Sequence, residues 1–356
     1  RLSTVAKRSA YLSLLLENPL ALQRMVNLFS ASNLVHQWLR QQPALLDDLI
    51  HPSHQTLDQQ TIEQQLTRRC HKIVDDETLQ ELMVQTMHSV RLNIATAELT
   101  EQIDHLQASQ ALCSLAAVII QKVLQHLWQS PSFFGTHHEN HDIRHCGFCI
   151  IAYGTLGAEE MRYDSDLDLI FLYDDQRVNE AVATKLARKM IHWLSTTGNA
   201  GRLYSIDTRL RPNGRSGLLV TTINAFRDYQ LEQAWVWEQQ ALCRARPIAG
   251  DEKLGSEFET IRQQVLCQQR HQNELAQNMD EMRTKMQETW IASLHKKQGQ
   301  LFSLKFSPGG LLDIQFICQY WQLLYSHQYP ELARFRNTLT TLKALADHKD
   351  NHIDHQ

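Results

Sequence analysis

Two aspartates one residue apart, Asp166 and Asp168, lie where a strongly apolar run of the sequence begins. Alternate side chains of a β-strand share one face, about 6.5–7 Å apart along the chain. Both carboxylates would therefore point the same way while Leu167 and Leu169 enter the core. Two metal ions about 3.5–4 Å apart require carboxylates placed like this. Magnesium is the expected metal, because the ligands are hard oxygens and the substrate would be a phosphate.

A third acid and a glycine turn strengthen this interpretation. Asp207 ends another predicted strand and would lie beside the pair if the two strands are neighbours, as a third metal ligand or as a base. Gly154 would let the backbone approach phosphates closely, and Thr155 offers them a hydroxyl and an amide. An isolated Asp-x-Asp is common at solvated strand ends, whereas this combination is much rarer. The predicted catalytic and metal-binding residues are therefore Asp166, Asp168 and Asp207.

Arginines are concentrated just after this third acid. Arginine suits bidentate recognition of phosphate and keeps its charge when partly buried. Arg209 and Arg211 alternate after Asp207, which predicts that they reach a bound triphosphate. Alternatively, some of these arginines pair with local acids such as Glu232, Glu238 or Asp251. Residues 201–250 contain seven arginines and no lysine: Arg202, Arg209, Arg211, Arg215, Arg227, Arg244 and Arg246.

Strands and helices alternate around these residues. Short apolar runs predict buried strands over 148–153 and 167–173, and a third strand is expected over 201–207. Apolar residues at helical spacing between Val182 and Trp193 predict a helix before that third strand. This interleaving indicates an α/β or α+β domain over residues 145–250.

Helices flank this core on both sides. Residues 1–130 are expected to form a helical linker or scaffold region, with Asn18-Pro19 and Gln42-Pro43 as helix starts and helices near 76–98 and 100–129. Residues 251–356 are expected to form a C-terminal helical domain, with helices over 270–295 and from about Asp313. The chain opens on Arg1 and stops in a polar stretch, so we expect a fragment of a longer protein with its last domain truncated.

Two cysteines, Cys146 and Cys149, have the spacing of half a zinc site and follow a histidine-rich segment at 137–145. The sequence has no second Cys-x-x-Cys, and Cys149 lies inside an apolar strand pattern. Buried structural cysteines are the favoured interpretation, and a metal site is the alternative.

Aromatic and methionine residues also have a simple structural interpretation. Trp235 and Trp237 are expected on the core face of a helix and not in a base-stacking platform. Met282, Met286 and Trp290 recur every four residues, which indicates packing along a long helix.

Composition restricts the class of partner. A formal net charge of -4 over 356 residues gives no global basic field, so a nucleic-acid partner is not expected and a protein or small-molecule acceptor fits better. Seven cysteines, an odd number, indicate reduced thiols and a cytoplasmic location. The longest apolar run, 112–127, is interrupted by polar residues and is shorter than the roughly 18 residues of a membrane span, so no membrane partner is expected.

Taken together, five segments resemble one family. Ala-Tyr-Gly-x-Leu-Gly at 152–157, Tyr-Asp-Ser-Asp-Leu-Asp-Leu-Ile-Phe-Leu at 163–172, Asp-x-Arg-Leu-Arg-Pro-x-Gly at 207–214, Trp-Glu-x-Gln-Ala-Leu-x-Arg-Ala-Arg at 237–246 and Gly-Gly-x-x-Asp-Ile-x-Phe at 309–316 are similar to the bifunctional glutamine synthetase adenylyltransferase/adenylyl-removing enzymes. The resemblance is strong over about 145–340. The leading helices match the central region of that family more loosely.

This resemblance implies a helix-rich α+β fold: a polymerase β-type nucleotidyltransferase core with a small mixed sheet, flanked by N-terminal and C-terminal helical domains. The implied activity is Mg²⁺-dependent transfer of AMP from ATP to a tyrosine of glutamine synthetase, which regulates nitrogen assimilation, under control by the PII signal protein and glutamine. The segments at 153–154, 163–168 and 234–238 are similar to the C-terminal, adenylylating half.

Three alternatives remain open. The chain could catalyse the adenylyl-removing phosphorolysis that yields ADP, or it could be a catalytically silent regulatory helical module. An aminoglycoside-type small-molecule nucleotidyltransferase fits less well with the extended helical flanks.

Three positions depart from the family pattern. Thr155 replaces a usual lysine, Ala158 replaces a glycine and Gln315 replaces a glutamate, which puts any metal or base role at position 315 in doubt. Lys305 is the candidate replacement for the missing lysine. The predicted nucleotide-binding set is Gly154, Thr155, Ser165, Arg209, Arg211 and Lys305.

Overall fold

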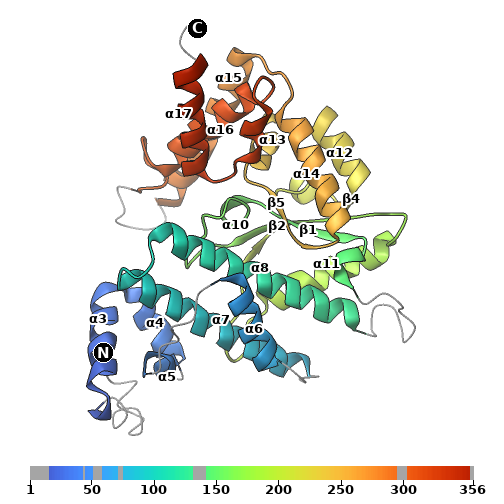
Figure 1. The fold of residues 1–356 in the computed structure, drawn as a ribbon. Coiled ribbons are helices and arrows are strands. Elements are labelled where there is room, and N and C mark those ends of the chain that lie inside the picture. The colour runs from blue at the N-terminus through green and yellow to red at the C-terminus, as the bar shows by residue number, and fades with distance from the viewer. Residues whose placement is uncertain are drawn as a thin grey trace. The chain divides into compact units, whose positions relative to one another are not determined.

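The computed structural model, whose helices and strands are labelled in Figure 1, divides into two compact units. It describes residues 16–42, 45–50, 58–70, 75–130, 142–294 and 303–352. Unit 1 comprises 1–123, 160–166 and 189–205, and unit 2 comprises 124–159, 167–188 and 206–356. The three-part division expected from the sequence stays a prediction.

Unit 1 is helical, and its helices bury a small apolar cluster that includes Trp38, Leu39 and Leu92. Asn18 and Pro19 begin its first described helix, as predicted. The helical residues expected before Leu16, and Pro43, lie outside the described residues. The helices are α3 (Pro19–Ala31), α4 (Asn33–Gln41), α5 (Leu46–Ile50), α6 (Gln59–Cys70), α7 (Asp76–Leu99) and α8 (His105–Gln129), whose last residues belong to unit 2.

The segment that leads into the Asp-x-Asp pair is fixed to these helices. The Tyr163 hydroxyl donates a hydrogen bond of 2.7 Å to Glu98 of α7, and the ring meets Trp38 edge-on with centroids 5.6 Å apart. Ser109 of α8 donates a 2.7 Å bond to the carbonyl of Met161. Burial, followed by the Glu98 carboxylate, raises the pKa of Tyr163, so this phenol stays protonated as a donor.

Among the described helices, α8 is long and apolar enough to cross a membrane by length and composition. Within its most apolar 18-residue window, 72% of the residues are buried inside the structure. Such burial is typical of a core helix.

Unit 2 contains a mixed five-stranded sheet. β1 (Phe148–Ala152) pairs antiparallel with β2 (Leu167–Tyr173) and with β5 (Arg246–Gly250), with a register shift between Ile150 and Ile151. β3 (Ile206–Asp207) and β4 (Val220–Thr222) both run parallel to β2, at its beginning and at its end. The strand order is β3-β2-β1-β5, with β4 also paired to β2. The predicted helix-rich α+β class with a small mixed sheet is confirmed.

The strands predicted over 148–153 and 167–173 are confirmed as β1 and β2. The third prediction was too long, because only 206–207 of the expected 201–207 form a strand. Tyr204 explains the difference: its N–H bonds the carbonyl of Leu194, and its buried ring lies 5.0 Å from the Arg91 guanidinium. The residues before β3 are thus held by helices of unit 1.

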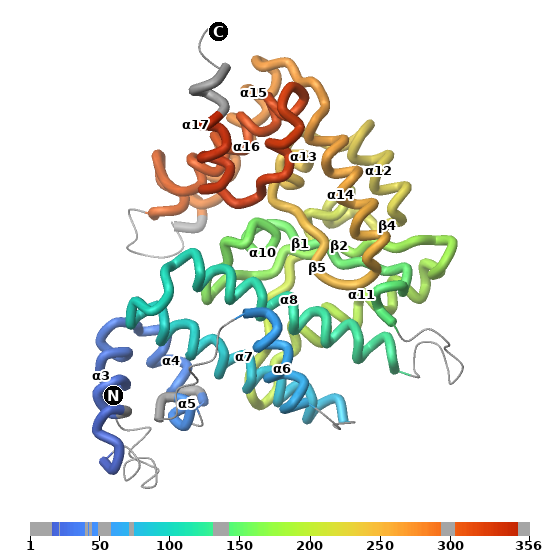
Figure 2. Tube along the Cα trace, viewed as in Figure 1, coloured from blue at the N-terminus to red at the C-terminus, as the bar shows by residue number. Residues whose placement is uncertain are grey.

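Helices of unit 2 and the sheet share an apolar core cluster. Cys149 and Ile151 of β1, with Ile170 of β2, join Phe226 and Phe258 in this cluster. Figure 2 follows the chain from β1 through the short α10 into β2. The unit's helices are α10 (Gly154–Gly157), α11 (Glu180–Ser195), which ends in unit 1, α12 (Ile223–Glu232), α13 (Val236–Leu242), α14 (Glu252–Leu266), α15 (Gln272–Leu294), α16 (Leu311–Tyr325) and α17 (Thr338–His352).

The tryptophan at position 235 was assigned wrongly from the sequence. Trp235 precedes α13 and is 68% exposed, so it does not belong to the core. The backbone N–H of Trp235 donates to the buried carboxylate of Glu238, which fixes the start of the helix. Trp290 does pack as expected, stacked on Phe306 with centroids 6.0 Å apart.

Candidate active site

The start of β2 positions the central acid. Leu167 and Leu169 are completely buried, whereas Asp168 between them is half-buried. The predicted burial of Leu167 and Leu169 on either side of Asp168 is confirmed, whereas a common direction of Asp166 and Asp168 stays a prediction. Asp166 lies just before the strand and is exposed.

Asp207 lies beside Asp168, as the sequence predicted. The two residues are direct partners in the parallel pairing of β2 with β3. Neighbouring strands are about 4.8 Å apart, and partners in register project from the same face of the sheet. The two acids are thus neighbours on one sheet face, at the edge where β3 adds only two residues.

The glycine turn closes over the same acid. Gly154 begins α10 with a φ of +58°, a conformation that favours glycine. A Cβ built on Gly154 would lie 2.1 Å from Oδ2 of Asp168, so the carboxylate occupies the space that any other residue would fill. Thr155 follows in the turn and is half-buried.

Arg209 binds Asp207 directly. The backbone N–H and Nε of Arg209 donate to the carboxylate at 2.9 and 2.6 Å. Burial acts to raise the pKa of Asp207, but the hydrogen bonds and charge of Arg209, with the charge of Arg215, outweigh it and hold the pKa below its ordinary value. Asp207 is therefore an ionised carboxylate at neutral pH. The alternative of pairing with a local acid holds for Arg209, with Asp207 itself as the acid.

Arg211 bonds to its own loop, and its predicted contact with a bound triphosphate stays a prediction. Its guanidinium donates to the carbonyls of Thr208, Arg215 and Gly217, with N···O distances of 2.8 to 3.2 Å. These bonds close the loop after β3. In this structure the side chain of Arg211 organises the loop that carries its neighbours.

A basic cavity of about 570 Å³ lies at this edge of unit 2. Arg215, which the sequence interpretation left out of the binding set, lines it and is exposed. The clustering of arginines after Asp207 was the signal that could have included it. The lining residues are Ile206, Asp207, Thr208, Arg209, Arg211 and Arg215.

Two other predicted nucleotide-binding residues have contacts within their own segments. The Ser165 hydroxyl accepts a 2.9 Å bond from the N–H of Arg162 within the unit 1 segment 160–166. Lys305 lies before α16 with its ammonium 5.2 Å from the ring centroid of Phe306. Binding of a nucleotide by Ser165 or Lys305 stays a prediction.

The donors at the sheet edge are suited to a hard divalent cation. Asp168 and Asp207 contribute carboxylate oxygens on one face, and Gly154 leaves space for the first of them. Across the described part of the chain, however, no group of three histidine, cysteine, aspartate or glutamate residues is already arranged to hold a metal ion. Asp207 is instead turned to Arg209, so a metal role for the three acids stays a prediction.

The cysteine pair behaves as buried packing. Cys146 and Cys149 are 3% and 1% exposed, and Cys146 Sγ donates to the carbonyl of Phe148. Burial raises the pKa of Cys146 to about 12, which keeps its thiol protonated and unreactive. The histidines at 137, 138 and 141 lie outside the described residues.

The sequence that forms this site also matches a known protein family. The site consists of a glycine turn, two acids in register and a basic loop. The profile of the family described as glutamate-ammonia ligase adenylyltransferase matches residues 22–261, which include the sheet and the candidate site. This chain belongs to that family.

Curated relatives agree with this family. The chain is 37% identical over 368 residues to the bifunctional glutamine synthetase adenylyltransferase/adenylyl-removing enzyme of Nitrosococcus oceani. It is 38% identical over 354 residues to the enzymes of the same name from Burkholderia mallei and Burkholderia pseudomallei. In each case the match covers 97% of this chain and 37% of the relative. The chain thus spans little more than a third of the length of these relatives.

Proposed function

We propose that this chain transfers AMP from ATP to a tyrosine of glutamine synthetase, as the adenylylating part of a longer enzyme. The observation that carries the proposal is the in-register pair Asp168 and Asp207 against the Gly154 turn, in a member of an adenylyltransferase family. Control by the PII signal protein and a cytoplasmic location belong to the same proposal. They are supported by the resemblance and by the composition alone.

The residues of the site have separable tasks in this reaction. The triphosphate of ATP lies over the Gly154 turn, where the glycine admits a close approach of the backbone. Arg209 and Arg215 in the basic cavity offset the charge of the departing pyrophosphate. Mg²⁺ held by Asp168 and Asp166, with Asp207, would polarise the α-phosphate and stabilise the leaving group.

The lowered pKa of Asp207 favours one of its two predicted roles. A general base works best when its pKa lies near the operating pH. Asp207 is ionised well below that pH because Arg209 and Arg215 stabilise its negative charge. It therefore fits the role of a metal ligand better than that of the base for a tyrosine hydroxyl, whose ordinary pKa is about 10.

The test is radiolabelled AMP transfer from ATP to purified glutamine synthetase, with and without a chelator. Label on glutamine synthetase that disappears with chelator supports the proposal, and no label with Mg²⁺ present contradicts it. Incubating adenylylated glutamine synthetase with phosphate measures ADP release, the product of the removing reaction.

A matched pair of variants locates the activity. Asp166→Ala should abolish AMP transfer and leave the fold intact, because it removes a predicted metal ligand from an exposed position. Asp164→Ala is the control, because Asp164 is an exposed acid two residues away that lies 3.6 Å from Arg162. Full activity in Asp166→Ala would count against the site.

A further inference from the structure

The Gly154 turn is held from behind by side chains of other segments. Arg244 Nε donates to the carbonyl of Gly154 at 3.3 Å, and Arg246 Nε donates to that of Leu156 at 3.3 Å. The amide of Asn337 donates to the carbonyl of Ala158 at 3.5 Å. Three carbonyls within residues 154–158 thus accept hydrogen bonds from side chains of other segments. The donors are Arg246 in β5, Arg244 just before β5, and Asn337 just before α17.

The backbone of the turn also packs closely against the backbone at Arg244 and Ala152. A Cβ built on Gly157 would lie 2.0 Å from the carbonyl oxygen of Arg244 and 2.6 Å from that of Ala152. Backbone atoms at such distances cannot move aside as a flexible side chain would. A displacement of the segment around Arg244 would therefore be transmitted directly to the turn.

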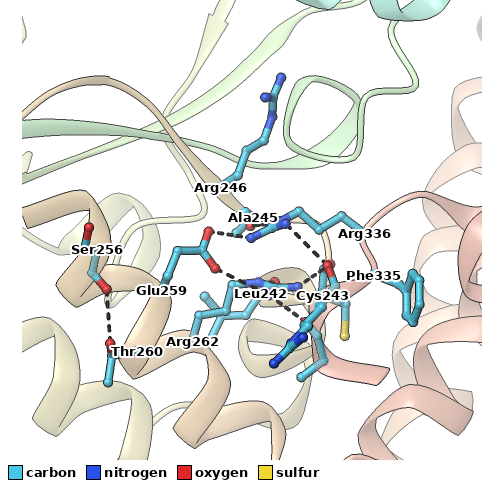
Figure 3. Close-up of polar contacts among 12 residues, drawn as sticks. Leu242, Cys243, Ala245, Arg246, Ser256, Glu259, Thr260, Arg262, Phe335 and Arg336 are labelled. Carbon is cyan, nitrogen blue, oxygen red and sulfur yellow. Dashed lines mark hydrogen bonds and ion pairs between the residues drawn. The ribbon is translucent and has the colours of Figure 1, made fainter. Parts of the chain in front are cut away.

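The segment that bears Arg244 is fixed in turn by two arginines (Figure 3). Arg262 is fully buried, and its guanidinium donates to the carbonyls of Leu242, Cys243 and Ala333 at 2.7 to 3.0 Å. Arg336 Nε donates to the carbonyl of Ala245 at 2.8 Å, and its Nη2 pairs with Glu259. The segments 242–245 and 333–336 are therefore joined by charged donors on backbone oxygens.

Asn337 has two functions that can be separated chemically. Its Oδ1 accepts the N–H groups of Leu339 at 3.0 Å and Thr340 at 3.3 Å, which caps the beginning of α17. Its Nδ2 donates to the turn at Ala158. Arg244 Nη1 donates to Thr338 at 3.2 Å, so both sides of the contact are linked to the same helix start.

We propose that Asn337, Arg244 and Arg246 are positioning residues for the nucleotide turn, and that Arg336 makes the start of α17 part of the same catalytic apparatus. The inference rests on the proposed function, because it assigns these residues to a turn that binds the triphosphate. A misplacement of about 1 Å in a catalytic site can cost on the order of a hundredfold in rate. The support is therefore expected to affect catalysis more than folding.

The main test replaces Asn337 by residues that can still cap α17 but cannot make the amide hydrogen bond to Ala158. Serine and aspartate both cap helices well but have no amide to donate to Ala158. Asn337→Ser and Asn337→Asp should unfold at the same temperature as the unsubstituted protein, with kcat/KM for ATP lowered about tenfold, mostly through kcat. Two variants are needed because the added charge of aspartate could itself repel ATP.

A second variant tests the arginine. Arg336→Lys keeps the charge but replaces a fork that binds Ala245 and Glu259 together by a single ammonium. It should lower kcat/KM for ATP in the same way. Arg334→Ala is the control, because Arg334 is exposed and only two residues away, and its activity should not change.

Hydrogen–deuterium exchange gives a readout that does not require activity. Amides of residues 154–159 should exchange faster in Asn337→Ser and Arg336→Lys than in Arg334→Ala. Unchanged exchange there, or unchanged kcat/KM in an active protein, overturns the inference and leaves the proposed function standing. Absence of AMP transfer by the unsubstituted protein overturns the proposed function, while exchange still decides whether these residues fix the turn.

Discussion

The two ends of β1 both combine a glycine of positive φ with an acid, yet they have opposite properties. At the first end, Gly147 has a φ of +68° and donates its N–H to Asp251 at 2.9 Å. The Asp251 side chain is completely buried and also accepts from Leu254 at 3.0 Å and from Arg177 at 2.8 Å. This acid is shielded from solvent and accepts three hydrogen bonds within the protein, so it stabilises the fold.

At the other end, Gly154 meets Asp168, and Asp207 lies in register on the next strand. Both acids are only half-buried, and the cavity beside Asp207 is lined by arginines. A glycine next to an acid is therefore not enough to recognise a site. Burial separates an acid that holds the protein together from one that can exchange its partner for a ligand.

The largest expected effect is on chemistry at the open end. Asp168→Ala should lower the rate of AMP transfer by about a thousandfold or more, the scale of losing a central electrostatic contact in an active site. The unfolding temperature should change little, because the side chain is half-buried at a strand end. Single-turnover transfer to glutamine synthetase measures the rate. A loss of less than about tenfold would contradict the conclusion that Asp168 acts in catalysis whereas Asp251 stabilises the fold.

The buried end should respond in stability. Asp251→Ala leaves Arg177 and two backbone N–H groups without their acceptor, and the free energy of unfolding should fall by about 3 kcal/mol. Urea denaturation measures this loss. AMP transfer per folded molecule should remain normal; a specific loss of activity would show that the two ends are coupled.

The two glycines allow a matched comparison. Gly147→Ala and Gly154→Ala both place a side chain at positive φ, at a cost of about 1 kcal/mol each. The alanine Cβ at 154 would also displace the Asp168 carboxylate, whereas at 147 the nearest atom is Cβ of Arg177 at 3.0 Å. We expect about a tenfold loss of AMP transfer in Gly154→Ala alone. Similar activity in the two variants would contradict the assigned roles.

The smallest effect concerns protonation of Asp207. Because its pKa is lowered in the folded protein, its contribution to stability is present above the ordinary carboxyl pKa and is lost as the pH falls through the folded value. Arg209→Gln should raise this pKa, since it removes the side-chain bond and charge that oppose burial. A carboxyl carbon NMR titration measures the change, and an unaltered midpoint would show that Arg209 is not its cause.

Sequence patterns located the parts of the site that follow from local periodicity. β1 and β2 were predicted because each is a continuous apolar run, and the register of Asp168 with Asp207 follows once β3 pairs with β2. β5 was missed because Arg246–Gly250 is half-buried throughout and contains proline. β4 was missed because it has only three residues.

Side-chain partners were harder to predict than strands. The bonds of Arg211 to carbonyl oxygens of its own loop could not be predicted, because backbone carbonyls are present at every residue and leave no pattern in the sequence. Trp235 was expected on the core face of a helix with Trp237, whereas the helix begins one residue later and leaves Trp235 outside. Asn337 had no signal at all, since its target at Ala158 lies 179 residues away.

The pairing of β3 with β2 extends over two residue pairs, Leu167 with Ile206 and Asp168 with Asp207. Separating β3 from β2 breaks only a few backbone hydrogen bonds, and β1 can remain paired with β2 and β5 when this happens. Local opening of the sheet is therefore expected to cost less free energy at the margin that carries Asp207 than in its middle strands. We therefore expect that opening of this margin would leave the rest of the sheet paired.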